Sequence, residues 1–158
     1  MQHRVAFYPC CASDIVEPLS ILKQYADEIC FCDIRPLPRR VIAEHRVSPP
    51  TARFIQGDAR EVITHIGRID VLFYRRDSNG EGGSGLFVLG DTFFPRILEV
   101  FNPQGGLIIT DGSNSRGGLF KKMKSTRGLT KYGWHIHKTE EQPFEKAHGL
   151  LIFSVLPS

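Results

Sequence analysis

The chain has 158 residues, of which 41% are hydrophobic and 23% charged, and its formal net charge is +3. This length suits one domain with one hydrophobic core, and the small charge does not require nucleic acid or an acidic membrane as a partner. The sequence has neither a run of about 18 apolar residues nor a signal peptide, so we expect a cytoplasmic protein without a membrane span.

Apolar runs and amphipathic segments alternate along most of the chain. The apolar runs predict strands over residues 4–8, 28–34, 53–56, 69–74 and 107–110. Helical spacing predicts helices over residues 15–26, 39–45, 60–66 and 91–101. Asp14, with Glu17 three residues later, and Asp91 are predicted N-caps of the first and last of these helices. This alternation predicts a parallel sheet with helices on both faces.

The end of the chain has a different pattern. Trp134 and Ile136 alternate with two histidines, which indicates a half-buried strand, and residues 150–156 form an apolar run. No helix fits comfortably between the two segments, so we expect them to pair antiparallel. The sequence therefore predicts one α/β domain over residues 1–158, with a single doubly wound, mostly parallel sheet of about seven strands and an antiparallel C-terminal strand pair.

Ligands of such sheets bind beyond the carboxyl ends of the strands, where the strand order switches. The candidates for function are therefore the segments that follow the strands: 8–14, 33–36, 57–59, 74–85 and 111–114. A carboxylate such as Asp33 can accept hydrogen bonds from two neighbouring hydroxyls, each contributing about 1.5–3 kcal/mol. The alternatives are a solvated strand-end residue for Asp33 and a helix N-cap for Asp58.

Three local features, in this order and spacing, resemble the class I S-adenosylmethionine-dependent methyltransferase family. They are Phe31-Cys32-Asp33-Ile34, Gly57-Asp58-Ala59, and Pro103-Gln104-Gly105-Gly106 before the fifth strand. The resemblance implies S-adenosylmethionine as the cofactor, with Asp33 on its ribose hydroxyls and the loop at Asp58 on its adenine amine. It also places the neighbouring Ile34 and Ala59 among the cofactor-binding residues.

The first turn departs from the family pattern, which has a Gly-x-Gly type of loop because the backbone passes close to the cofactor. This chain reads Tyr8-Pro9-Cys10-Cys11-Ala12-Ser13-Asp14. The turn is similar to Tyr-Pro-x-x-Gly-x-Asp, a variant found in methyltransferase-like proteins, with Ala12 in place of glycine. We therefore predict cofactor contacts at Tyr8, Pro9, Ala12 and Asp14. If residue 12 needs a positive φ, Ala12→Gly should tighten cofactor binding about fivefold, on the order of 1 kcal/mol.

The segment after the fourth strand is where methyltransferases place residues that face the substrate. Here it reads Tyr74-Arg75-Arg76-Asp77 and lacks an Asn-Pro-Pro-Tyr type of motif, so methylation of adenine or of a glutamine amide is not expected. Arg75 or Arg76 is a candidate for binding a substrate carboxylate or phosphate, and Asp77 is a candidate general base. The alternative is a charged loop held by its own ion pairs.

The cysteines occur as Cys10-Cys11 and as Cys30 and Cys32. Neither pair has the two-residue gap usual in zinc sites, and a reducing compartment argues against disulfides, so we predict no metal site and no disulfide framework. His135 and His137 are expected at the surface.

The sequence leaves more than one function open. The leading hypothesis is methyl transfer from S-adenosylmethionine to a small molecule or an exposed group of a macromolecule, which mainly requires alignment of nucleophile and methyl group. The alternative is a non-catalytic methyltransferase-like fold that acts as a nucleotide-derivative binder or a protein-interaction module. A nicotinamide-dependent oxidoreductase is disfavoured because a Gly-x-Gly-x-x-Gly turn is absent. Since no substrate domain is evident, either the substrate is small or a second copy of the chain covers the site.

Overall fold

The computed structural model describes residues 3–36, 50–75, 86–113, 133–139, 145 and 148–158. Within these segments the chain forms a seven-stranded sheet with the order β3-β2-β1-β4-β5-β7-β6. The strands are β1 (Val5–Pro9), β2 (Glu28–Asp33), β3 (Thr51–Gln56), β4 (Val71–Tyr74), β5 (Gly106–Thr110), β6 (Trp134–Lys138) and β7 (Leu151–Pro157). The helices are α1 (Val16–Leu22), α3 (Ala59–Val62) and α4 (Phe94–Val100). The predicted helix over 39–45 lies outside the described residues.

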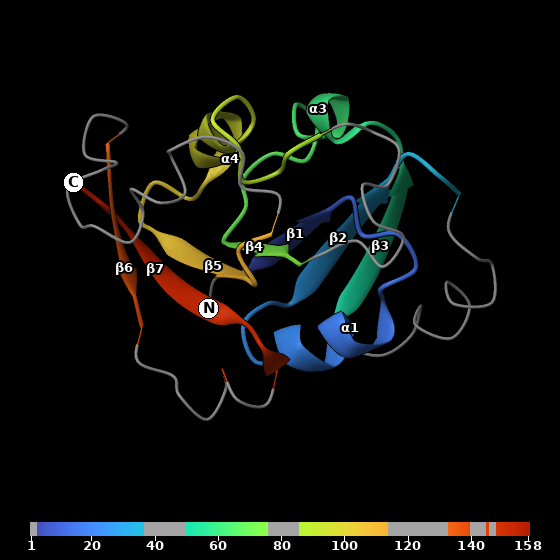
Figure 1. Ribbon diagram of the computed structural model, residues 1–158, viewed down its shortest axis with the longest axis horizontal. Helices are drawn as coiled ribbons and strands as arrows, with labels where there is room; N and C mark the ends of the chain where they lie inside the picture. The colour runs from blue at the N-terminus through green and yellow to red at the C-terminus, as the bar shows by residue number, and fades with distance from the viewer. Residues whose placement is uncertain (1–2, 37–49, 76–85, 114–132, 140–144, 146–147) are drawn as a thin grey trace.

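The pairing of the strands confirms the predicted sheet. Strands β1 to β5 run parallel to one another, whereas β7 runs antiparallel to both β5 and β6. Figure 1 shows α1 on one face of the sheet and α3 and α4 on the other. None of the helices in the described segments is long and apolar enough to cross a membrane.

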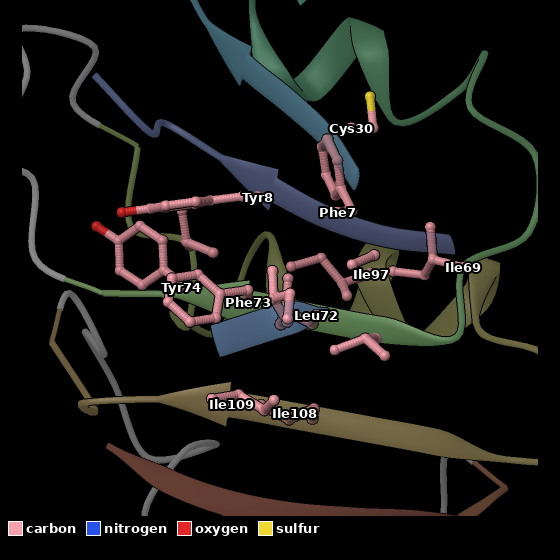
Figure 2. Close-up of a cluster of buried hydrophobic side chains, with 14 of the residues drawn as sticks. Phe7, Tyr8, Cys30, Ile69, Leu72, Phe73, Tyr74, Ile97, Ile108 and Ile109 are labelled. Carbon is pink, nitrogen blue, oxygen red and sulfur yellow. The ribbon is translucent and has the colours of Figure 1, made fainter. Parts of the chain in front are cut away.

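The core lies on both faces of the central strands β1 and β4, whose continuous apolar runs are typical of strands covered by helices. The side chains of Phe7 and Phe73 are fully buried, and the rings of Tyr8 and Phe73 meet edge to face at 4.8 Å. Figure 2 shows Ile97 of α4 in the same buried cluster as Phe7 and Leu72. The apolar stripe predicted for this helix therefore faces the sheet.

Two predicted helix caps are wrong. Helix α1 begins at Val16, and the residue at its N-cap position, Ile15, makes no side-chain hydrogen bond to the helix. The carboxylate of Asp14 contacts other side chains instead, as described below. Helix α4 begins at Phe94 behind Phe93, so Asp91 does not cap it.

The third predicted cap is confirmed. Asp58 lies at the N-cap of α3, and its carboxylate accepts a hydrogen bond of 2.9 Å from the backbone N–H of Arg60. The helices α1 and α3 are shorter than the predicted ranges 15–26 and 60–66, because turns and bends replace their last residues.

Candidate functional site

The strand order reverses between β1 and β4, at the carboxyl edge of the sheet. The chain builds β2 and β3 on one side of β1, then crosses to β4 and β5 on the other side. Such a switch point is where open α/β sheets bind their ligands. The turn after β1, the residues that follow β2 and β3, and Arg75 after β4 all lie at this edge.

The turn after β1 has an unusual backbone. Cys10 has a φ of 57° and Ala12 a φ of 51°, and they are the non-glycine residues with positive φ in the described part of the chain. Each such conformation costs roughly 1–2 kcal/mol for a residue with a Cβ. The N–H of Cys11 donates to the carbonyl of Cys32 at 3.0 Å, which ties the turn to the end of β2. Residue 12 therefore has the positive φ that the glycine test requires.

Asp33 holds the same turn from the neighbouring strand. Its side chain is 3% exposed, and its Oδ2 accepts a hydrogen bond of 2.7 Å from the N–H of Ala12. Its Oδ1 accepts bonds from the backbone N–H and the Nε–H of Arg35, at 2.9 and 3.1 Å. The sequence did not predict this structural role, which follows from the pairing of β2 with β1.

The lone pairs of this carboxylate decide whether a ribose fits. A carboxylate offers roughly four acceptor positions, and three donors from this chain occupy Asp33. One acceptor position, on Oδ2, therefore remains, and a second hydroxyl would have to replace the Nε–H of Arg35 at Oδ1.

A polar network joins the two sides of the switch point. Asp14 accepts hydrogen bonds from the hydroxyl of Tyr8 at 2.6 Å and from Nε and Nη2 of Arg75, both at 2.6 Å. The remaining terminal nitrogen of Arg75, Nη1, donates to Glu17 at 2.7 Å. Hydrogen bonding to Asp14 raises the pKa of Arg75, and burial followed by the charge of Asp14 raises the pKa of Tyr8 above its usual range. Arg75 therefore stays charged and bridges β4 to the first turn.

The loop after β3 carries a second pair of charges. The guanidinium of Arg60 contacts both carboxylate oxygens of Asp58, with Nη2 2.6 Å from Oδ2. Hydrogen bonding to Arg60 lowers the pKa of Asp58. Ile34, which follows β2, is 47% exposed and presents an apolar side chain at this edge of the sheet. Ala59 is buried behind Asp58.

The structure brings the predicted residues together in two groups. Ala12 contacts Asp33, and Tyr8 and Arg75 contact Asp14. Pro9 is the last residue of β1 and pairs with Cys32. Further members of the loop after β4, Arg76 and Asp77, lie outside the described residues.

The sequence did not predict two members of this edge. Glu17 binds Arg75 from α1, and the Nδ1 of His148 lies 3.9 Å from Oε1 of Glu17. His148 reaches this edge because β7 is antiparallel, so that its amino end, Leu151, lies opposite Thr110 at the end of β5. The position of His148 could have been predicted from the antiparallel pair, because an antiparallel strand begins at the edge where its parallel neighbours end.

The buried cysteines are protonated at neutral pH. Burial raises the pKa of Cys30 to about 11 and that of Cys32 to about 12, and it raises the pKa of Cys11 still further. A thiol in this state packs as a small apolar side chain. Among the residues that the structure describes, no three His, Cys, Asp or Glu side chains form a group that could hold a metal ion.

No protein-family model and no curated protein matches the amino-acid sequence. Solved structures do match the fold. Precorrin-8w decarboxylase from Methanobacterium thermoautotrophicum has a TM-score of 0.56 at 17% identity, over 99% of this chain and 83% of that one. The ribosomal protein L11 methylase from Lactobacillus delbrueckii subsp. bulgaricus has a TM-score of 0.52 at 11% identity, over 99% of this chain and 71% of that one.

A third similar structure contains a ligand related to the predicted cofactor. Phosphoethanolamine N-methyltransferase 1 from Haemonchus contortus, solved with phosphoethanolamine and S-adenosylhomocysteine, has a TM-score of 0.56 at 11% identity. The match covers 100% of this chain and 40% of that one, so this chain spans less than half of that enzyme. These likenesses show that the chain has the Rossmann-like fold of class I S-adenosylmethionine-dependent methyltransferases, as the sequence features predicted.

Proposed function

We propose that the protein binds S-adenosylmethionine at the carboxyl edge of the sheet and transfers its methyl group to a small molecule or an exposed group of a macromolecule. The observation that carries this proposal is the positive φ at Cys10 and Ala12 in the turn after β1. Backbone strain of this kind persists where the surroundings impose it, and it clusters at ligand sites. Here it lies at the switch point, in the turn that this fold uses for its cofactor.

The neighbouring residues have the chemistry that an adenosyl group requires. We assign the ribose hydroxyls to the carboxylate of Asp33, and one face of the adenine ring to the exposed side chain of Ile34. The adenine amine would donate to Asp58, whose lowered pKa keeps it ionised at neutral pH. Ala12 and Ala59 supply small side chains on either side of these contacts. When bound, the cofactor supplies an activated methyl group.

Arg75 enters this proposal as a positioning residue. Its three side-chain nitrogens contact Asp14 and Glu17, so a substrate anion would have to compete with two carboxylates for it. The bridge that it forms fixes the first turn relative to β4, which is where an acceptor would approach the methyl group. Asp77 remains the proposed base of this loop.

The same contacts favour a second candidate, a non-catalytic protein that binds a nucleotide derivative. The guanidinium of Arg75 binds Asp14 and Glu17 of this chain, and the carboxylate of Asp33 already accepts hydrogen bonds from three donors. A binder of this kind would retain the adenosyl site without a group that activates an acceptor. Binding without turnover therefore distinguishes this candidate from the first.

The test is calorimetric titration of S-adenosylmethionine and S-adenosylhomocysteine into the wild type, Asp33→Asn and Asp70→Asn. Asp70 is a buried carboxylate at the opposite edge of the sheet and serves as the matched control. We expect micromolar binding to the wild type, at least tenfold weaker binding to Asp33→Asn, and unchanged binding to Asp70→Asn. An absence of heat with the wild type, or equal losses in both variants, contradicts the proposal.

Turnover is measured separately from binding. Protein that binds S-adenosylmethionine is incubated with fractionated small-molecule and protein extracts, and S-adenosylhomocysteine is quantified. Formation that depends on both the acceptor fraction and an intact Asp33 supports methyl transfer. Binding of both ligands with no product in any fraction supports the non-catalytic candidate.

A further inference from the structure

A cavity of about 300 Å³ lies between the start of α3 and the segment that leads into α4. Its lining includes Arg60, Phe87, Asp91, Thr92, Phe93 and Arg96. Helices α3 and α4 cover the same face of the sheet (Figure 1). Because α3 follows the carboxyl end of β3, and α4 runs back toward the amino edge, the cavity lies near the carboxyl edge of the sheet. Its volume falls in the range of small-molecule sites.

Arg96 lines this cavity with an unusual set of contacts. Its Nη2 donates to the backbone carbonyl of Arg60 at 2.9 Å, and its guanidinium carbon lies 6.0 Å from the centre of the Phe93 ring. In contrast to Arg60, which pairs with Asp58, it forms no ion pair with a carboxylate of the described residues. One of its five N–H groups therefore has an acceptor among the described residues, and its charge also acts on the carboxylate of Asp58.

These contacts prepare Arg96 for an anion. The carbonyl of Arg60 and the buried ring of Phe93 fix the orientation of the guanidinium before a ligand arrives. A fixed guanidinium presents a fork of N–H groups that matches a carboxylate or a phosphate, and such charge-assisted bonds are roughly twice as strong as neutral ones. The partly exposed side chains of Leu86 and Phe87 also line the cavity and offer an apolar surface to the rest of the ligand.

We propose that this cavity is a binding site for a small organic anion, a carboxylate or phosphate monoester on a planar apolar body. Arg96 holds the anionic group, and the side chains of Leu86 and Phe87 contact the apolar body. Asp91 lines the same cavity, so the anionic group is directed toward Arg96 and away from that carboxylate. The site does not depend on S-adenosylmethionine or on methyl transfer.

The test uses phenyl phosphate and benzoate as probes, with inorganic phosphate and phenol as their separate halves. Each is titrated into ¹⁵N-labelled wild type, Arg96→Gln and Arg68→Gln, and shifts of the Arg96 Nε–Hε and Phe93 amide signals are followed by NMR. Arg68 is an exposed arginine before β4 at the amino edge, so its variant matches the change of charge. Thermal melting verifies that each variant is folded.

We expect saturable shifts at Arg96 and Phe93 with phenyl phosphate or benzoate, and at least tenfold weaker binding of either half alone. Arg96→Gln should weaken binding at least tenfold, while Arg68→Gln leaves it unchanged. Arg96→Lys, which keeps the charge without the fork, should lie between them and replaces Arg96→Gln if that variant does not fold. Shifts that do not saturate, that map to other residues, or that fall equally in both glutamine variants overturn the proposal. Because no adenosyl ligand is present, its failure leaves the proposed function untouched.

Discussion

Each edge of the sheet buries one aspartate that binds the backbone of a neighbouring segment. At the amino edge, Asp70 accepts hydrogen bonds from the N–H of Val5 at 2.8 Å and from the side-chain amide of Asn102 at 2.9 Å. At the carboxyl edge, Asp33 accepts hydrogen bonds from the N–H of Ala12 at 2.7 Å and from Arg35. The two carboxylates are 6% and 3% exposed, so the difference between the edges is not one of burial.

The difference lies in the backbone that each aspartate holds. Near Asp70 the sequence has glycine where the geometry requires it: Gly105 has a φ of 113°, and a Cβ on Gly106 would collide with the carbonyl of Asp70. Beside Asp33, positive φ falls on Cys10 and Ala12. Local sequence and structure therefore agree at the amino edge and conflict at the carboxyl edge. Such conflicts are expected at functional sites, which supports the proposed ligand site at the carboxyl edge.

The largest predicted effect is at the amino edge. In Gly106→Ala the new Cβ would overlap the backbone of Asp70, the residue before β4, and contact the ring of Phe101 at 2.9 Å. Neither strand can move without breaking the sheet, so we expect a loss of about 5 kcal/mol or more in the free energy of unfolding, measured by urea denaturation. The control, Gly67→Ala, has a φ of 75° and open space around it, and should lose only about 1 kcal/mol. Equal losses of stability in Gly106→Ala and Gly67→Ala would show that the close packing around Gly106 does not set it apart from Gly67.

The second prediction concerns alkaline pH and the thiols near the carboxyl edge. The pKa values of Cys30 and Cys32 are about 11 and 12 in the folded protein, against 9.0 for an ordinary thiol, and burial raises that of Cys11 further. Above pH 9 the unfolded chain therefore loses protons that the folded chain keeps, and stability falls as pH rises. At pH 10 each thiol accounts for a loss on the order of 1 kcal/mol in the free energy of unfolding.

Urea denaturation between pH 8 and pH 10.5 measures this loss. Cys32→Ala removes one titrating thiol, so its stability should fall less steeply by about one proton. If Cys32→Ala leaves the dependence of the free energy of unfolding on pH unchanged, then Cys32 has the same pKa in the folded and the unfolded chain. Val71 is buried and carries no titrating group, so Val71→Ala serves as the control and should leave the dependence of stability on pH unchanged.

The features that the sequence predicted are those that depend on local pattern. Continuous apolar runs gave the central strands, and alternation gave β6, whose Trp134 and Ile136 are buried. The predicted cap at Asp14 is wrong because the carboxylate pairs with Arg75, 61 residues further along the chain. No local pattern shows a partner at that distance.

The candidate site was harder to predict than the fold. Its defining feature is the positive φ at Cys10 and Ala12. Cysteine and alanine rarely adopt this conformation, so the sequence gives no sign of it. The cavity at Arg96 was also missed, because the apolar spacing of α4 describes the side that faces the sheet and not the side that faces α3. Both features arise from packing between segments that are distant in the sequence.

The smallest predicted effect tests the strained turn directly, with Ala12→Gly. Ala12 has a φ of 51°, and its N–H donates to the buried carboxylate of Asp33, so contacts within the chain itself hold the strained backbone. Its relief should therefore stabilise the fold rather than mainly tighten binding, which changes the expectation drawn from the sequence. Removing about 1–2 kcal/mol of strain and adding about 0.4–1 kcal/mol of unfolded-state entropy leaves a gain on the order of 1 kcal/mol in the free energy of unfolding.

The matched control for this variant is Ala52→Gly. Ala52 lies within β3, where φ is negative and glycine offers no relief, so its variant should lose about 1 kcal/mol. Opposite signs for the two alanines, measured by urea denaturation, would establish strain at the carboxyl edge. A loss in Ala12→Gly as large as in Ala52→Gly would mean that the turn is not strained. In that case the backbone would no longer distinguish the two edges, and the argument for a ligand site would rest on Asp33 and Ile34 alone.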